Sequence, residues 1–328
     1  MFGAHLEDLG IPHQRHGNNI WCIAPGYDAQ RPTILLNGHL DTVRPVSGWT
    51  YDPFTPTEAN GKLFGLGSND DGGGVVALLQ AFRILSQRHQ LYNLVFLASC
   101  EEEVSGRNGV ESVLPLLPPI DFAVVGEPTS MQPAIAEKGL MVIDAVAHGK
   151  AGHAARNEGV NAIYKALRDI QWIEGHTFEK QTDLLGPVKT TVTIIQAGTQ
   201  HNVIPDQCTF TIDVRSNECY TNQELFDALD HQLDSELKAR SFRLNSSMLP
   251  SSHPFIRKAI ETGHIINRDI TPFGSPTLSD QALMPFLSVK LGPGDSSRSH
   301  TADEYIKPKE IEEAILFYVS VLDGLKLS

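Results

Sequence analysis

Short runs of apolar residues rich in β-branched side chains recur along the chain, and each run ends in a polar loop. Four of them are predicted to be core strands: residues 33–36, 94–97, 122–125 and 287–291. Helix-like segments alternate with these runs, notably residues 75–85 and a last helix over residues 309–325. The alternation predicts an α/β fold in which helices cover both faces of a parallel-rich mixed sheet.

A second pattern interrupts the first and is predicted to form an inserted domain. It consists of a strand (141–147), a helix (161–173), two strands (190–196 and 209–214), a helix (222–239) and a last short strand. The order βαββαβ is typical of a ferredoxin-like α+β unit. We therefore predict a catalytic domain of residues 1–138 and 247–328 and an insert of residues 139–246, which suits a chain of 328 residues.

Composition limits the partners that the chain can have. Acidic residues outnumber basic ones by 39 to 26, and this balance argues against nucleic acid because phosphate binding needs clustered Lys and Arg. The four cysteines form no CxxC pair, so neither a disulfide framework nor a thiolate zinc site is predicted. No apolar run of about 18 residues occurs, and we expect a cytoplasmic protein without a membrane partner.

Motifs rich in His, Asp and Glu follow the predicted strands. NGHLDTV follows the first strand, SCEEEVSG the second, VGEPTS the third and GPGDSSRSH the last, while GLGSNDDGGG opens the helix at residue 75. Taken singly, these residues have ordinary explanations: Asp70 and Asp71 could cap the helix, and residues 101–103 could be a solvated acidic face. Ligands of open α/β sheets collect beyond the carboxyl ends of the strands, so we expect the motifs to converge there.

Converging carboxylates and imidazoles predict a metal site, because the acids repel one another unless cations lie among them. Imidazole together with carboxylate suits zinc or cobalt, whereas an all-oxygen shell suits magnesium or calcium. Asp41 lies two residues after His39, so both side chains leave the same face of an extended segment. Its carboxylate can then hold the imidazole in the metal-binding tautomer.

Together the motifs resemble the cocatalytic zinc metallopeptidase family that includes acetylornithine deacetylase, succinyl-diaminopimelate desuccinylase, aminoacylase and carboxypeptidase G. The similarity covers nearly the whole chain and continues through HGKAGHAARNEGVNAI and AGTQHNVIPDQC to SRSHTADEYI. SCEEEVSG, GSPTLSDQALM and GTQHNVIPD look closest to the acetylornithine deacetylase-like branch of Bacteroidetes-type bacteria. The resemblance implies a zinc aminopeptidase-like fold whose insert serves as lid and dimerisation domain.

The resemblance also implies two zinc ions, for which cobalt or manganese can substitute. Five ligands are assigned to them: His39, Asp70, Glu103, Glu127 and His300. One ion would be held by His39, Asp70 and Glu127, and the other by Asp70, Glu103 and His300, so that Asp70 bridges. Two assignments have an alternative. Asp71 could bridge in place of Asp70, and the base and the ligand in the Glu101–Glu103 run could each lie one residue away from Glu102 and Glu103.

Glu102 is the general base that the resemblance implies. Two cations about 3.5–4 Å apart would share a water and lower its pKa. Glu102 would take the proton of that water and pass it to the departing amine, which requires a raised carboxyl pKa. Asp41 would support His39, and the peptide bond between Asp70 and Asp71 is expected to be cis.

Further residues are assigned by the same resemblance. His153 of the GHAA motif would reach the active site of the partner subunit and stabilise the oxyanion, unless its role is structural. Asn202 and Arg215 would contact substrate, because an Arg fork suits an α-carboxylate. Arg298 is predicted to bind a second acid or side-chain group of the substrate.

The expected function is hydrolysis of the amide of an N-acetyl- or N-succinyl-ornithine or -citrulline in arginine biosynthesis, by a homodimer. A dipeptidase or a general aminoacylase would share every ligand, and a metal-free binding protein built on a dead hydrolase is the alternative of another class. The chain has Gly72 where the family has Lys and Arg156 where it has Pro, which affects substrate preference rather than chemistry. Because the family's first helix begins earlier, a segment upstream of Met1 is expected.

Overall fold

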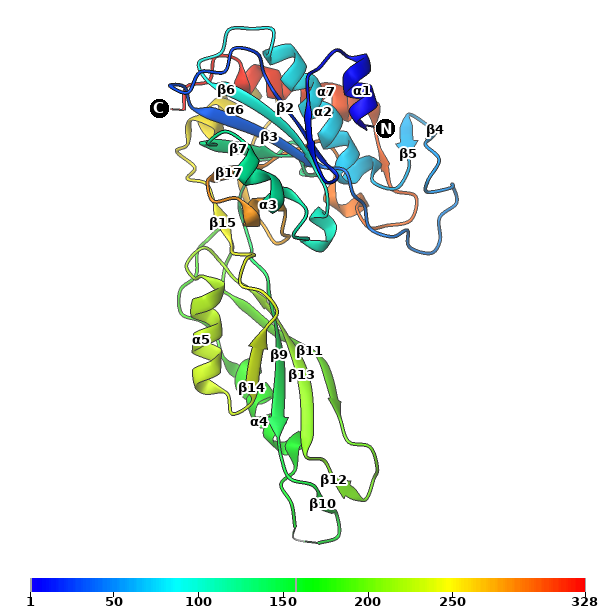
Figure 1. Cartoon of the computed structure of the whole chain (residues 1–328), viewed down its shortest axis with the longest axis vertical. Coiled ribbons are helices and arrows are strands. Elements are labelled where there is room, and N and C mark those ends of the chain that lie inside the picture. The colour runs from blue at the N-terminus through cyan, green and yellow to red at the C-terminus, as the bar shows by residue number, and fades with distance from the viewer. Residues whose placement is uncertain (1, 157, 328) are drawn as a thin grey trace. The chain divides into compact units, whose positions relative to one another are not determined.

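The computed structural model describes residues 2–156 and 158–327 and divides the chain into two compact units, whose elements are labelled in Figure 1. The first unit comprises Met1–Ile135, Met248–Phe273 and Ser279–Ser328, and the second comprises Ala136–Ser247 and Gly274–Leu278. The chain passes between the units four times: within the short strands β8 (Ala134–Glu137), β15 (Ser247–Met248) and β16 (Phe273–Ser275), and between Leu278 and Ser279. The segment 274–278 is a part of the second unit that the sequence pattern does not predict.

The first unit is built around a sheet whose central strands are parallel. Its strands are β1 (Gln14–His16), β2 (Asn19–Ile23), β3 (Thr33–His39), β6 (Asn93–Ser99), β7 (Phe122–Val125) and β17 (Leu287–Lys290). They lie in the order β1-β2-β6-β3-β7-β17, and the pairs β6/β3, β3/β7 and β7/β17 are parallel. The short strands β8 and β15 continue the same sheet beyond β17, and β16 pairs with β8. A separate small sheet holds β4 (Thr57–Ala59), β5 (Lys62–Phe64) and β18 (Tyr305–Ile306).

Helices cover both faces of the main sheet, as predicted. The helices are α1 (Phe2–Asp8), α2 (Gly73–Leu85), α3 (Val110–Val113), α6 (Pro254–Ile265) and α7 (Pro308–Leu322). Ile34 and Leu36 of β3 pack in one apolar cluster with side chains of α1, α2, α6 and α7, whereas Leu35 packs in another with α3. Every residue of β3 is buried, because a strand covered on both faces needs apolar side chains in both directions.

The second unit is a four-stranded antiparallel sheet with two helices. Its elements are β9 (Met141–His148), β10 (Gly152–His153), α4 (Ala162–Gly175), β11 (Lys189–Ala197), β12 (Val203–Ile204), β13 (Gln207–Arg215), α5 (Asn222–Gln232) and β14 (Glu236–Ala239). The strand order β11-β13-β9-β14 is the ferredoxin-like order predicted from βαββαβ. Alternate residues of β9, including Met141, Ile143 and Ala145, pack with α4 and α5.

One predicted helix is too long. We predict a helix over residues 222–239, but α5 ends at Gln232 and Glu236–Ala239 forms β14 instead. The carboxylate of Asp169 accepts the backbone N–H groups of Asp234 and Ser235 at 3.2 and 3.0 Å. These two donors are therefore unavailable for a further helical turn, and the chain turns into the last strand.

No helix among residues 2–156 and 158–327 is long and apolar enough to cross a membrane.

Candidate metal centre

His39 stands at the carboxyl end of β3 and is 2% exposed. Its Nδ1 lies 2.9 Å from the main-chain oxygen of Asp41. A carbonyl can only accept, so Nδ1 carries the proton and Nε2 is directed toward other ligands, as in metal-binding imidazoles. Nε2 lies 3.1 Å from Oδ1 of Asp70 and 3.9 Å from Oε1 of Glu127.

Asp41 contacts His39 with its side chain and its backbone. Its Oδ1 lies 3.7 Å from Nδ1 of His39, an ion-pair distance, and its backbone carbonyl lies closer, at 2.9 Å. The carboxylate also accepts the backbone N–H groups of Glu102 and Glu103, each at 3.2 Å, which the sequence did not predict. Asp41 therefore ties the end of β3 to the turn that carries two of the predicted functional acids.

Asp70 lies between two imidazoles. It is part of η1 (Ser68–Gly72), the irregular turn before α2. Its Oδ1 lies 3.1 Å from Nε2 of His39, and its Oδ2 lies 3.6 Å from Nε2 of His300. One oxygen directed at each imidazole is the arrangement that a bridging carboxylate needs.

Asp71 has different surroundings. It is fully buried against Gly38, Gly74 and Gly126, and it belongs to neither group of converging donor atoms found among the described residues. The geometry thus favours Asp70 over Asp71 as the bridge. The peptide bond between them is cis, which confirms the prediction.

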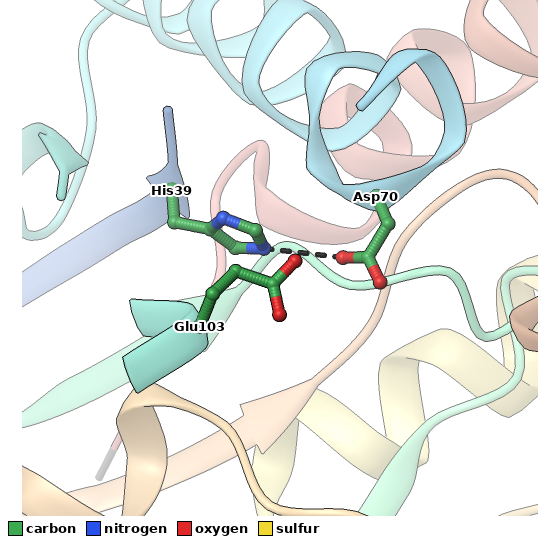
Figure 2. Close-up of side chains that lie close together, drawn as sticks. All are labelled: His39, Asp70 and Glu103. Carbon is green, nitrogen blue, oxygen red and sulfur yellow. Dashed lines mark hydrogen bonds and ion pairs between the residues drawn. The ribbon is translucent and has the colours of Figure 1, made fainter. Parts of the chain in front are cut away.

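The three consecutive glutamates separate in space. Glu101 turns away, and its carboxylate accepts the backbone N–H of Asn108 at 3.1 Å. Glu102 and Glu103 begin η2 (Glu102–Val104), the turn after β6. Oε2 of Glu103 lies 3.2 Å from Nε2 of His300, and Figure 2 shows the Glu103 carboxylate beside His39 and Asp70.

The donor atoms form two overlapping groups. Within each group the atoms lie within 4.8 Å of one another: His39, Asp70 and Glu103 form the first, and His39, Glu102 and Glu127 the second. His300 joins the first group through Asp70 and Glu103, and its own side chain is 54% exposed. The structure therefore brings all five predicted ligands and Glu102 together at one edge of the sheet.

Burial and mutual repulsion shift the pKa values of the acids in this cluster. Burial raises the pKa of Glu102 well above its usual range, and the carboxylates of Asp280 and Glu103 add to the rise. Burial likewise raises the pKa of Glu127, where Glu102 is the next cause. Burial alone would lower the pKa of His39, but the acids around it raise that pKa well above its usual range. Imidazole and carboxylate donors that crowd in this way fit a divalent cation such as zinc.

Three further predicted residues belong to the second unit. His153 is exposed on β10, and its Nδ1 accepts the backbone N–H of Ala155 at 3.1 Å. Asn202 is also exposed, and its backbone carbonyl accepts the backbone N–H of Ala154 at 3.0 Å. Arg215 is half-buried at the end of β13. Its guanidinium binds Asp213 through two hydrogen bonds of 2.9 and 3.2 Å.

Arg298 already has partners within its own unit. Its guanidinium binds both carboxylate oxygens of Glu310 at 2.8 and 3.0 Å and lies 4.6 Å from the ring centre of Tyr305. This arrangement links η5 (Ser296–Arg298) to the start of α7. Contact between Arg298 and a substrate stays a prediction.

The sequence interpretation overlooked several buried residues outside the ligand set. Asp280 accepts hydrogen bonds from Nδ2 of Asn37 at 2.9 Å and Oγ of Ser99 at 2.7 Å, and so joins the ends of β3 and β6. Next to Asp70, the Glu304 carboxylate accepts the backbone N–H of Asn69, and the Asn69 side chain donates to Oγ of Ser299. Asp280 and Glu304 lie within two of the family motifs, GSPTLSDQALM and SRSHTADEYI, but no sequence pattern around them predicts that they are buried.

Comparisons with known proteins agree with this geometry. The sequence profile of the family described as "Peptidase family M20/M25/M40" matches residues 35–324. Acetylornithine deacetylase of Proteus mirabilis is 33% identical over 303 residues, which cover 85% of this chain and 76% of the relative. Acetylornithine deacetylase of Klebsiella pneumoniae is 32% identical, with 94% and 84% covered. The aminopeptidase PepT of Bacillus cereus has the same fold, with a TM-score of 0.76 at 18% identity over 97% of this chain and 90% of that chain.

Proposed function

Because the chain belongs to peptidase family M20/M25/M40, we propose that it is a di-metal amidohydrolase that removes a small acyl group from an N-acyl amino acid. The observation that carries this proposal is the meeting of two imidazoles with four carboxylates at one sheet edge. Such a cluster is costly without cations and therefore supports a metal-dependent reaction.

The proposed metal positions share Asp70. His39, Asp70 and Glu127 would hold one cation, and Asp70, Glu103 and His300 the other. The mixed imidazole and carboxylate donors support zinc, with cobalt or manganese as substitutes. When bound there, divalent cations supply Lewis acidity at an amide carbonyl and lower the pKa of water.

Glu102 is the proposed proton carrier. Its carboxylate would take a proton from the attacking water and deliver it to the nitrogen of the departing amine. A base that must also act as an acid needs a pKa close to the working pH, and burial raises the pKa of Glu102 in that direction. Asp41 holds the backbone of Glu102 and thereby limits where this carboxylate can move.

The proposed substrate is an N-acetyl or N-succinyl derivative of ornithine or citrulline, and the proposed pathway is arginine biosynthesis. Two relatives at 33% and 32% identity named acetylornithine deacetylase support this choice. Arg215 and Asn202 are the proposed contacts to the α-carboxylate, and Arg298 is a proposed contact to a second group. The four free cysteines suit a reducing compartment such as the cytoplasm.

A substrate panel tests the proposed reaction. Zinc-loaded protein should hydrolyse N-acetylornithine, N-acetylcitrulline or their succinyl analogues with a higher kcat/KM than any dipeptide. Higher rates on dipeptides would replace the deacylase proposal by a dipeptidase, and equal rates on many N-acyl amino acids would indicate a general aminoacylase. Metal binding without any hydrolysis would favour a binding protein.

We also propose that the second unit forms a homodimer through β11. This strand is the edge of its sheet, and its backbone groups are free to pair with another strand. Ile194 and Ile195 on β11 are each 50% exposed, and Tyr164 and Leu167 on the neighbouring α4 are 65% and 41% exposed. Apolar side chains along an open edge fit a second copy of the chain.

Subunit mixing tests the dimer and the proposed role of His153 together. Light scattering should give twice the monomer mass, and Ile194→Lys should lower it. Mixed His153→Ala and Glu102→Ala subunits should regain activity if His153 acts in the site of the partner. Absence of any regain in a proven mixed dimer would mean that each subunit is self-contained.

A further inference from the structure

The five proposed ligands are held in two different ways. His39 is the last residue of β3, Glu103 lies in the turn after β6, and Glu127 lies just after β7. Asp70 and His300 instead stand in irregular segments, far from each other in sequence and outside the sheet. Their positions must therefore be set by other interactions, and hydrogen bonds between these two segments provide them.

Glu304 connects the segment after His300 to the turn that carries Asp70. It is only 2% exposed. Its Oε1 accepts the backbone N–H groups of Asn69 and Asp70, each at 2.9 Å, and its Oε2 accepts that of Gly67 at 3.0 Å. Both carboxylate oxygens are thus used, and one of the bonds is made to the proposed bridging residue itself.

Asn69 makes the reverse connection. It is fully buried, and its Nδ2 donates to the carbonyl of Asp295 and to Oγ of Ser299, both at 3.1 Å. Its Oδ1 accepts the backbone N–H of Asp295 at 3.1 Å. Ser299 directly precedes His300, so Asn69 orients the backbone from which that imidazole extends.

We propose that Asn69 and Glu304 are positioning residues that set the geometry of the second metal position, formed by Asp70, Glu103 and His300. The inference rests on the proposed metal-dependent function. It adds that two of the three ligands of this position, Asp70 and His300, are held by a hydrogen-bonded clamp. The third, Glu103, lies in the turn after β6, and His39 and Glu127 of the other position lie at or just after the ends of β3 and β7. The side chain of His300 is 54% exposed, so burial contributes less to its position than it does for His39, and the clamp matters most there.

Glu304→Gln tests the clamp with little change of shape. Oε1 and Oε2 both accept N–H groups, so the amide nitrogen of glutamine must face a donor on one side. Glu312, exposed on α7, supplies the matched control Glu312→Gln. Apo protein is titrated with zinc by calorimetry, and its unfolding temperature without metal is recorded in parallel.

Wild-type protein and Glu312→Gln should each bind two zinc ions with the same affinities. In Glu304→Gln the affinity of the position formed by Asp70, Glu103 and His300 should fall about 10–100-fold, the usual effect of losing a residue that orients ligands. The affinity of the other position should fall less, because the two positions share only Asp70. Asn69→Asp, which loses the amide donor, should weaken the same binding event. A purely structural role would lower the unfolding temperature of the apo protein and leave both zinc affinities unchanged.

Equal zinc binding by Glu304→Gln and wild type overturns the inference while leaving the proposed function intact. Wild-type protein that binds no zinc would instead remove the proposed function and the clamp with it. Should Glu304→Gln fail to fold, Asn69→Asp and Ser299→Ala decide, because unchanged zinc affinities in both contradict the clamp.

Discussion

The functional residues of the two units differ in how firmly the chain holds them. In the first unit His39 is almost completely buried and is oriented from two sides, by Asp41 and Asp70. In the second unit His153 and Asn202 are exposed, and the His153 imidazole accepts a hydrogen bond from the backbone of Ala155, two positions away. The first unit therefore holds its proposed ligands by contacts with other elements, whereas the contact recorded for the His153 side chain is local.

Chelation should have the largest effect, because it would remove the cations on which the proposed reaction depends. Incubation with EDTA followed by dialysis should abolish hydrolysis of N-acetylornithine, and added zinc should restore it. The unfolding temperature should fall as well, since the carboxylates then repel one another. A chelated protein that retains full activity and contains no metal by elemental analysis would contradict the proposed chemistry.

Glu102→Gln should have the next largest effect. Loss of a general base costs typically about 10²–10⁴-fold, so kcat should fall by that factor while zinc stoichiometry stays unchanged. Glu101→Gln is the matched control, because Glu101 binds Asn108 instead of joining the cluster. If the two variants retained equal kcat, the assignment of the base within the triple glutamate would be wrong.

His153→Ala tests whether the exposed histidine of the second unit takes part in catalysis. Removal of an oxyanion donor costs about 10²–10³-fold in kcat, and this loss should occur without a change in unfolding temperature because the imidazole is exposed. His201→Ala, at another exposed histidine of the same unit, should leave kcat unchanged. A normal kcat for His153→Ala would confine catalysis to the first unit.

Arg298→Gln should have the smallest effect, and it would be on stability. Burial alone would raise the pKa of Glu310, but its hydrogen bonds to Arg298 lower that pKa below the usual value. A lowered folded-state pKa contributes stability at neutral pH that is lost as pH falls through that pKa. The variant should therefore lose about 1.5–3 kcal/mol of unfolding free energy at pH 7 and much less in acid.

Urea denaturation at several pH values measures this difference, and Lys309→Gln serves as the exposed control. The side chain of Lys309 is 83% exposed and lies 3.6 Å from Glu313, so its loss should hardly change stability. A raised KM in Arg298→Gln with unchanged stability would instead support the predicted contact between Arg298 and the substrate.

Much of the candidate site could be predicted because strand ends are visible in the letters. His39, Glu103 and Glu127 each follow an apolar run, and parallel strands bring their carboxyl ends to one edge. A second role of the Asp41 carboxylate could not be predicted in this way. The spacing of two residues predicts the pairing with His39, but only the fold shows that the same carboxylate also accepts the N–H groups of Glu102 and Glu103.

The error at α5 has a similar cause. Residues 222–239 have helical character locally, but the helix stops where Asp169, more than 60 positions earlier, binds the next N–H groups. Local propensity contributes only a few tenths of a kcal/mol per residue, and a tertiary hydrogen bond outweighs it. A single sequence does not reveal which distant acid will supply that bond.

By itself the sequence determined the layered α/β architecture, the ferredoxin-like insert and the residue types that meet at the sheet edge, because periodic apolar patterns specify which faces are buried. The resemblance already selected Asp70 over Asp71 and Glu102 as the base. Only the tertiary structure showed that Asp71 lies outside both groups of donor atoms, that Glu101 binds Asn108, and that Asn69 and Glu304 join the segments that carry Asp70 and His300. These arrangements depend on contacts between residues up to about 230 positions apart, such as Asp70 and Glu304, and no local pattern encodes them.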